Sequence, residues 1–374
     1  MRIVEAHEGD ALRTLRDEWR ALVERCEGAT IYQTWEWNEA WWRVFGARKR
    51  LRLLAAREGD ALVGLAPLYV SRHLGTPLRR LAFVGTGLSD YLDVIAPRGV
   101  APRVCALVLR HLAERRDHDL ADLQQLRPDA AMLELGRCHR EALHGAGHAI
   151  LVAQEPCPYV ALPPTWDEYA ARLGRKMRSN IGYQERLLGR AFERVENRLA
   201  GADDLHAAMD DLFVLHQRRW RARMLPGVLG GGSRRAFHRL VAERFAERGW
   251  LRLHTLRLDG RAAAALYCFA YRGRYGYYLG GFDPELARYS PGTVLTAAAI
   301  RQAIAEGCQE FDFLRGHEPY KYRWQPEERV NHRLLLSRPR SVRSHAMLRL
   351  NHLERYVEVR AKGFAERRGR SKTE

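Results

Sequence analysis

The sequence of 374 residues contains no apolar run that approaches the roughly 20 residues of a membrane-spanning helix. Its first ten residues, MRIVEAHEGD, also lack the apolar stretch of a secretory signal peptide. We therefore expect a cytoplasmic protein that has no transmembrane segment.

Cysteine is sparse and evenly scattered. The six cysteines occur singly, and no two of them form a CxxC pair. Disulfide scaffolds and cysteine-based zinc sites usually show recurrent, closely spaced cysteines. We expect reduced thiols in the core and predict no bound metal.

Several well-known catalytic motifs are absent. The sequence has no HExxH, no GxSxG, no Walker A sequence and no Rossmann glycine fingerprint. Each of these motifs places the catalytic or phosphate-binding groups of a particular enzyme class. Their absence argues against protease, NTPase and dehydrogenase functions.

The composition that is present is typical of a folded protein, with 46% apolar and 29% charged residues. A chain of this length is expected to form two domains. The formal net charge is +17, but only five of the 62 basic residues are lysine. Because this skew toward arginine indicates coding bias as much as selection, a solvated basic surface is favoured over a surface that binds nucleic acid or anionic lipid.

Helical and strand patterns alternate along the first half of the chain, which indicates a mixed α/β fold. A helix begins after Thr34, which has the side chain of an N-cap. Strands are predicted at 51–57 and 61–71, joined by the turn Glu58-Gly59-Asp60, and a further strand at 91–96.

The pattern restarts after a proline-rich stretch at 156–164, which we interpret as a linker. The second half again shows helices, then a hairpin meander, then a helix, so a tandem duplication of one α/β domain is inferred. We predict an N-terminal domain at 1–155, a C-terminal domain at 156–337 and a basic helical tail at 338–374 that packs on the N-terminal domain. The tail has eleven basic and four acidic residues, and apolar residues at roughly helical spacing, so peripheral contact with a membrane is an alternative role.

A first candidate site is the segment 288–295, RYSPGTVL, at the start of a predicted helix. Ser290 suits the N-cap, and Gly292 would let a ligand approach the backbone. The free N–H groups of a helix N-terminus suit a phosphate or pyrophosphate, although an ordinary well-capped helix explains the residues equally well.

A second candidate site is the glycine-containing segment 84–93, VGTGLSDYLD. Asp90 could act as a base or accept a hydrogen bond from a substrate amine. A simple turn at Ser89-Asp90 is the competing interpretation, and Asp93 could face out of the sheet.

A third candidate site is the segment 311–324, FDFLRGHEPYKYRW, in which an apolar strand leads into charged and aromatic residues. Arg315 and Lys321 could bind a carboxylate or phosphate, and Tyr320 could protonate a thiolate leaving group. His317 and Glu318 could act as a base. A sheet edge held by contacts between arginine and aromatic rings is the alternative.

Taken in order, the motifs resemble CelD-like acyltransferases of the GNAT superfamily, nearly to residue 338. The matching segments are WEW (35–37), WW (41–42), LVGLAPL (62–68), GLSDYLD (87–93), LGRKMR (173–178), HQRRW (216–220), YLGGF (278–282), SPGTVL (290–295), FDFLRG (311–316) and Tyr320-Lys321. The family is similar to Fem-type aminoacyl transferases, and the resemblance implies two tandem GNAT-like domains.

The resemblance also implies an acyl group transferred from acetyl-CoA or another acyl-CoA to an amine or hydroxyl, on an acceptor of cell-envelope or polysaccharide synthesis. It implies that Ser290, Gly292 and Thr293 bind the donor, together with Gly280 and Gly281 of the YLGGF motif. The acceptor would be bound by Arg315, Lys321, Asp93 and Trp220.

Two positions depart from the family pattern. Val294 stands where the donor-binding loop usually has glycine or alanine, and His317 stands where relatives often carry an acidic residue. An imidazole can still accept a proton near neutral pH.

Two other functions compete with this interpretation. The basic segment 172–190 and the net charge fit a Fem-like transferase that uses aminoacyl-tRNA. A GNAT-fold binding module without catalytic activity, which uses the tail at 341–372, is the third hypothesis.

Overall fold

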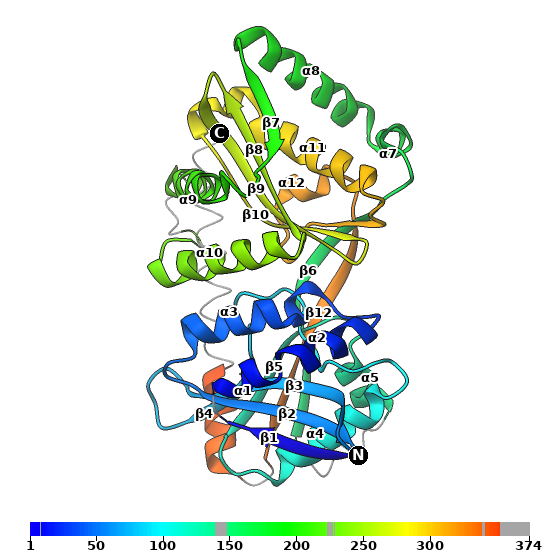
Figure 1. Ribbon diagram of the computed structural model, residues 1–374, viewed down its shortest axis with the longest axis vertical. Helices are drawn as coiled ribbons and strands as arrows, with labels where there is room; N and C mark the ends of the chain where they lie inside the picture. The colour runs from blue at the N-terminus through cyan, green and yellow to red at the C-terminus, as the bar shows by residue number, and fades with distance from the viewer. Residues whose placement is uncertain (8, 139–147, 223–226, 228, 339–340, 352–374) are drawn as a thin grey trace. The chain divides into compact units, whose positions relative to one another are not determined.

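The computed structural model describes residues 1–7, 9–138, 148–222, 227, 229–338 and 341–351. The chain forms two compact units, Met1–Gln154 together with the residues from Asn331 onward, and Glu155–Val330 (Figure 1). The long strands β6 (His148–Ala161) and β12 (Glu327–Ser337) both run through the division between the units.

The sheet of the first unit has the strand order β1-β2-β3-β4-β5-β12. Neighbouring strands are antiparallel except for the parallel pair β4 and β5. The other strands of this unit are β1 (Arg2–Ala6), β2 (Arg50–Glu58), β3 (Ala61–Arg72), β4 (Arg79–Phe83) and β5 (Leu120–Leu126).

The helices of the first unit precede β2 or follow β4. They are α1 (Asp10–Thr14), α2 (Arg16–Arg25), the 3-10 turn η1 (Ile31–Gln33), α3 (Trp35–Phe45), α4 (Ala101–Glu114) and α5 (Ala131–Cys138). Buried residues of α4 and α5 pack with β2, β3 and β4 in one apolar core. The predicted cap of α3 is confirmed, because the Thr34 side chain accepts a hydrogen bond from the Trp37 N–H.

The sheet of the second unit has the strand order β6-β11-β10-β9-β8-β7. The other strands are β7 (Val195–Leu199), β8 (Leu251–Leu258), β9 (Arg261–Tyr271), β10 (Arg274–Phe282) and β11 (Glu310–Asp312). The β8–β9 turn is formed by Asp259 (φ 48°) and Gly260 (φ 80°), as a tight hairpin requires. The predicted hairpin meander is therefore confirmed.

Helices cover both faces of this second sheet. Helices α9 (Leu205–Ala222) and α10 (Gly232–Glu247) lie on one face, and α8 (Arg175–Ala191) and α11 (Pro291–Ala305) on the other (Figure 1). The shorter elements are α7 (Trp166–Arg172), the 3-10 turn η2 (Pro284–Tyr289) and α12 (Pro319–Tyr322).

Two local predictions differ from the structure. Residues 91–96 form no strand, only an isolated bridge between Ile95 and Leu65. The Asp93 side chain accepts the backbone N–H groups of Ala131 and Met132, which ties this segment to the start of α5. The proline-rich stretch is also not a linker at its start, since Pro156 and Pro158 lie within β6. Their carbonyl groups accept the N–H groups of Gly316 and Phe313, so the missing proline N–H groups do not interrupt the strand.

The end of the second unit also lies earlier than the predicted 337. Strand β12 pairs with β5 from His332 to Ser337, which brings residues 331–337 into the first unit. The described part of the tail continues there: Arg343 pairs with Asp119, and Met347 packs on Leu120 and Leu335. Tail residues 339–340 and 352–374 lie outside the described residues, so the membrane contact stays a prediction.

Helix α9 packs closely on β10 at a glycine. A Cβ atom added at Gly281 would lie 2.3 Å from the backbone nitrogen of His216 and 2.6 Å from the carbonyl carbon of Leu215. Real Cβ atoms do not approach backbone atoms so closely, so a larger residue would push the helix from the sheet.

We predict that Gly281→Ala destabilises the protein by roughly 1–3 kcal/mol, because the added methyl group overpacks this contact. Thermal unfolding followed by circular dichroism should show a clearly lower midpoint. Gly189→Ala is the matched control, since a Cβ there meets nothing within 4 Å and alanine favours the helix. An unchanged midpoint for Gly281→Ala would contradict this account of the packing.

Candidate active site

Strands β10 and β11 separate soon after they pair. They are hydrogen-bonded in parallel over residues 274–276 and 310–312, where β11 ends. Strand β10 continues to Phe282, and a bulge between Tyr277 and Leu279 shifts its register with β9. Among the described residues no strand pairs with the β11-facing edge of β10 beyond Gly276.

Aromatic side chains lie where the two strands diverge. The Tyr277 ring is 6.2 Å from the ring of Phe313 and 6.2 Å from the ring of Tyr320, measured between centroids. The hydroxyl groups of Tyr277 and Tyr320 share a hydrogen bond. Burial raises the pKa of Tyr277 to about 12 and that of Tyr320 well above its usual value, so both hydroxyls stay protonated at neutral pH.

Arg219 reaches this place from helix α9. Its guanidinium carbon is 5.4 Å from the ring centroid of Phe282 and 5.4 Å from that of Tyr320. Its Nη1 atom is 3.5 Å from the carbonyl oxygen of Gly280, on the strand that has lost its neighbour. The buried Nε atom of Arg219 has no hydrogen-bond partner among the described residues.

The N-terminus of α11 also lies near Phe282. Ser290 joins η2 to α11 in the left-handed conformation (φ 48°, ψ 47°), and its side chain makes no capping hydrogen bond. Its carbonyl oxygen accepts the N–H groups of Thr293 and Val294. A Cβ added at Gly292 would meet only Phe282, at 3.7 Å, so the backbone at Gly292 is open to a ligand.

The loop between β11 and α12 is built around Lys321. Its buried ammonium donates hydrogen bonds to the carbonyl oxygens of Leu314 (3.2 Å), Arg315 (2.8 Å) and Gly316 (3.2 Å). The Glu318 carboxylate is 3.0 Å away. An ammonium group has three N–H donors, so these contacts leave none for a substrate.

The other residues predicted for this site differ in their exposure. His317 is exposed, and Glu318 is half-buried in its ion pair with Lys321. Gly280 lies beneath the Tyr277 ring, since a Cβ there would be 2.4 Å from the Tyr277 hydroxyl. Gly280 and Gly281 thus have packing reasons for lacking a side chain.

Trp220 is hydrogen-bonded to a buried histidine. Its indole N–H donates to Nε2 of His216 at 2.9 Å. Burial lowers the pKa of His216 to about 4, so the ring is neutral at pH 7. The Nδ1 atom of His216 has no partner among the described residues.

Asp90 and Asp93 lie in the first unit and not with the group around Tyr320. The buried Asp90 accepts a hydrogen bond from the Tyr32 hydroxyl at 3.0 Å. Asp93 accepts the backbone N–H groups of Ala131 and Met132 at the start of α5. Burial raises the pKa of Asp93 to about 6.

Sequence reasoning missed Arg219 and Tyr277. Arg219 lies within the motif HQRRW, and Tyr277 immediately precedes the motif YLGGF. Only the divergence of β10 from β11 brings the two residues together with Tyr320, and that divergence has no sequence pattern.

Other kinds of site find little support in the described part of the chain. No group of three or more histidine, cysteine or acidic residues there could hold a metal ion. The five cysteines that can be assigned are buried free thiols. None of the helices described combines the length and apolar character needed to cross a membrane.

Comparison with known proteins finds a family model that matches most of the second unit. Residues 175–322 match the model of the acetyltransferase (GNAT) domain, whereas no curated protein matches the chain. Solved structures with a similar fold share few identical residues with it, so they show the fold alone.

Three of these structures cover most of the chain. FemX has a TM-score of 0.61 at 10% identity, covering 88% of this chain and 96% of its own. A protein of unknown function from Bacteroides thetaiotaomicron VPI-5482 has a TM-score of 0.58 at 12% identity, covering 90% and 100%. The C-terminal domain of a putative lysylphosphatidylglycerol synthetase from Agrobacterium fabrum has a TM-score of 0.55 at 11% identity, covering 90% and 96%.

The predicted mixed α/β fold of GNAT type is confirmed by these findings. The residues at the end of β10, at the start of α11 and in the loop after β11 all lie within the matched segment. Residues 175–322 of the second unit are thus similar to the acetyltransferase (GNAT) domain.

Proposed function

We propose that the second unit transfers an acyl group from acyl-CoA to an amine or hydroxyl. The observation that carries the proposal is the open edge of β10, which lies beside two neutral tyrosines and close to the start of α11. A backbone edge of this kind can hydrogen-bond an extended ligand as a neighbouring strand would. CelD-like specificity and an acceptor of cell-envelope or polysaccharide synthesis remain part of this proposal.

The donor would bind with its pyrophosphate at the start of α11. The helix dipole favours negative charge there, and the Gly292 N–H could donate to the ligand. The N–H groups of Thr293 and Val294 instead donate to the Ser290 carbonyl, and Pro291 has no N–H. The Ser290 hydroxyl does not cap the helix, so it does not compete with a ligand for this position. Gly292 gives the ligand room, and Thr293 is the next residue along the helix.

Transfer requires a nucleophile, a leaving group and two proton movements. The acceptor attacks the thioester carbonyl, the C–S bond breaks, the thiolate gains a proton and the acceptor loses one. Tyr320 is proposed as the proton donor, because its hydroxyl is protonated and hydrogen-bonded to a second neutral tyrosine. Arg219 fixes the Tyr320 ring and the Gly280 carbonyl and is proposed as a positioning residue.

His317 is the proposed base, since it is exposed on the loop that Lys321 organises. Glu318 is less suited, because its carboxylate is held by the Lys321 ammonium. Asp90, in the first unit, is already the acceptor of the Tyr32 hydroxyl. For Lys321 we propose a structural role in place of substrate binding, and Arg315 keeps its proposed contact with the acceptor.

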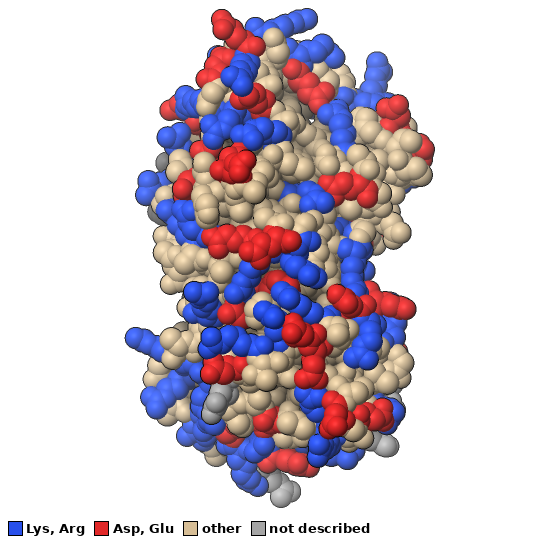
Figure 2. Space-filling view, in the orientation of Figure 1, with Lys and Arg blue, Asp and Glu red and all other residues tan. Residues whose placement is uncertain are grey.

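An aminoacyl-tRNA donor is the second candidate, and the surface of α8 is the observation that favours it. Its exposed residues include Arg175, Lys176, Arg178, Arg186 and Arg190. Such a basic face can bind the phosphates of a nucleic acid. On the face drawn in Figure 2, Lys and Arg side chains are interspersed with Asp and Glu. FemX and lysylphosphatidylglycerol synthetase share the fold with this chain, at identities too low to carry their substrates over.

We predict that Gly292→Asp weakens acetyl-CoA binding at least about tenfold, because the new carboxylate would repel the pyrophosphate. The protein should stay folded, since an acidic residue in the first turn of a helix is favourable. Titration calorimetry measures the affinity, and the near-isosteric Gly292→Asn is the matched control. Equal affinity for both variants would contradict donor binding at α11.

We predict that Tyr320→Phe lowers the transfer rate at least about tenfold and leaves acetyl-CoA affinity unchanged. The assay follows radiolabel from acetyl-CoA onto a panel of amino sugars, amino acids and polyols. Tyr322→Phe is the control, because this exposed neighbour in α12 donates its hydroxyl to the Glu328 carboxylate and has no contact with Tyr277 among the described residues. Equal rates for both variants would remove Tyr320 from the mechanism.

The tRNA alternative predicts a different result. Unacylated tRNA should then bind with an affinity that falls steeply as salt rises, and Arg175→Ala with Arg178→Ala should weaken it. The absence of salt-sensitive tRNA binding, alongside binding of acetyl-CoA, would reject this alternative.

A further inference from the structure

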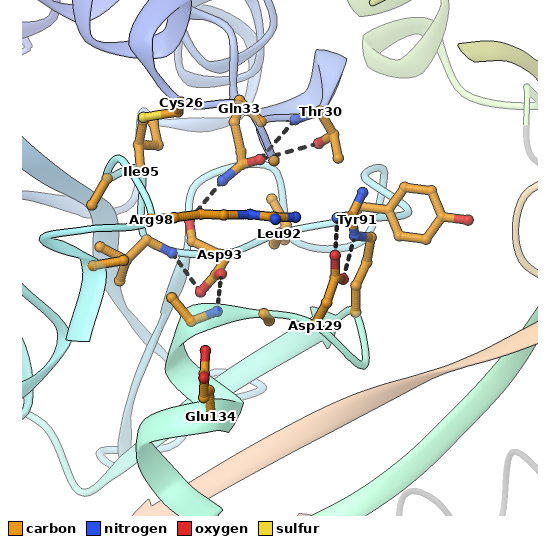
Figure 3. A pocket seen from close by; sticks show the side chains of 18 of the residues that line it. Cys26, Thr30, Gln33, Tyr91, Leu92, Asp93, Ile95, Arg98, Asp129 and Glu134 are labelled. Carbon is orange, nitrogen blue, oxygen red and sulfur yellow. Dashed lines mark hydrogen bonds and ion pairs between the residues drawn. The ribbon is translucent and has the colours of Figure 1, made fainter. Parts of the chain in front are cut away.

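The first unit contains a cavity of about 740 Å³, and Asp93 is one of the residues that line it (Figure 3). Cavities that bind small molecules usually measure about 300–1,000 Å³. Three parts of the unit form its wall: the turn before α3, the segment after β4 with the start of α4, and the start of α5. All of these parts belong to one compact unit.

Two arginines line the cavity. Arg98 is exposed and extends its side chain across the cavity (Figure 3). Among the described residues, no carboxylate pairs with it. The buried Arg127 has its guanidinium over the Tyr91 ring and donates two hydrogen bonds to Asp129.

Carboxylates also line the cavity. Glu134 projects from α5 toward Asp93 (Figure 3). Glu134 is exposed and has no cationic partner among the described residues. Asp93 already accepts three backbone N–H groups, so its orientation is fixed before any ligand arrives.

Apolar side chains, among them Leu92 and Ile95, and a few neutral polar groups complete the lining. Gln33 bonds through its side chain to the backbone N–H of Thr30, and its amide nitrogen is 3.5 Å from the Asp93 carbonyl oxygen. These residues add hydrogen-bonding groups to the charged ones. In a cavity of this kind a few polar groups fix the orientation of the ligand, so we expect a ligand that carries charged groups.

We propose that this cavity binds a small zwitterionic molecule, with its ammonium group at Glu134 and Asp93 and its oxyanion at Arg98. The ligand's two charges would thus face partners of opposite sign, and unpaired Arg98 and Glu134 would gain ion pairs that the free protein lacks. Amino sugar phosphates and amino acids share this chemistry. The inference does not rest on the proposed acyl transfer, because the cavity and the group around Tyr320 belong to different units.

The test is titration calorimetry with glucosamine 6-phosphate, without acyl donor, at low ionic strength. Glucose 6-phosphate lacks the ammonium and glucosamine lacks the phosphate, so both should bind at least about tenfold more weakly. Glutamate and lysine, each a free amino acid, form a second arm that separates an amino acid site from an amino sugar phosphate site. Binding by either arm at a Kd below about 1 mM supports the proposal.

Three variants identify the contacts. Arg98→Ala should weaken the binding of glucosamine 6-phosphate about tenfold and leave the affinity for glucosamine unchanged. Glu134→Gln should also weaken the binding of glucosamine 6-phosphate and leave the affinity for glucose 6-phosphate unchanged. Arg110→Ala removes an exposed arginine of α4 outside the cavity and should change nothing. All three side chains are exposed, so the fold should tolerate their loss.

Two results would overturn the inference. One is the absence of measurable binding for every zwitterionic probe. The other is binding that Arg98→Ala and Glu134→Gln leave as unchanged as Arg110→Ala does, because the ligand would then sit elsewhere on the protein.

Discussion

The hydrogen bonds from the Lys321 ammonium to three consecutive carbonyl groups shape the loop that follows β11. Leu314 (φ 58°) and Gly316 (φ 107°) take left-handed conformations there, which turn the chain away from β10. A buried ammonium is costly unless its donors are satisfied, and the three carbonyls together with Glu318 satisfy them. The edge of β10 therefore stays free, and Tyr320, next to Lys321, is placed beside Tyr277.

Helix α9 contributes to the same place from the other face of the sheet. The missing side chain at Gly281 lets the helix approach β10 closely. This approach brings Arg219 to the rings of Phe282 and Tyr320 and to the Gly280 carbonyl. The Arg219 guanidinium, which lies close to both rings, places a positive charge at the end of the strand. We propose that the polar groups of an acyl donor lie there.

Local features of the fold were predictable from the sequence because they depend on neighbouring residues. Thr34 caps α3, and Asp259-Gly260 forms a hairpin turn, since both depend on a few adjacent residues. Two errors arose where distant partners decide the structure. The Pro156 carbonyl accepts the Gly316 N–H within β6. Asp93 accepts the distant N–H groups of Ala131 and Met132 instead of continuing the sheet.

The candidate site was predictable only in part for the same reason. The segment at 290–293 and Tyr320 could be selected by residue type, because a helix N-terminus and a tyrosine each carry a recognisable chemistry. The roles of Arg219 and Tyr277 depend on contacts between segments up to about a hundred residues apart. Lys321 bonds to carbonyl groups only a few residues before it, but no sequence pattern marks that contact. The charged cavity of the first unit likewise joins three separate segments.

We propose that an acyl donor lies along the open edge of β10 and reaches the start of α11. Hydrogen–deuterium exchange with mass spectrometry, with and without acetyl-CoA, tests it most directly because it reports on each backbone segment. We expect slower exchange in residues 277–282 and 292–296 when acetyl-CoA is bound, and unchanged exchange in β7 and β8. Protection confined to other segments, or no protection under conditions where acetyl-CoA binds, would contradict it.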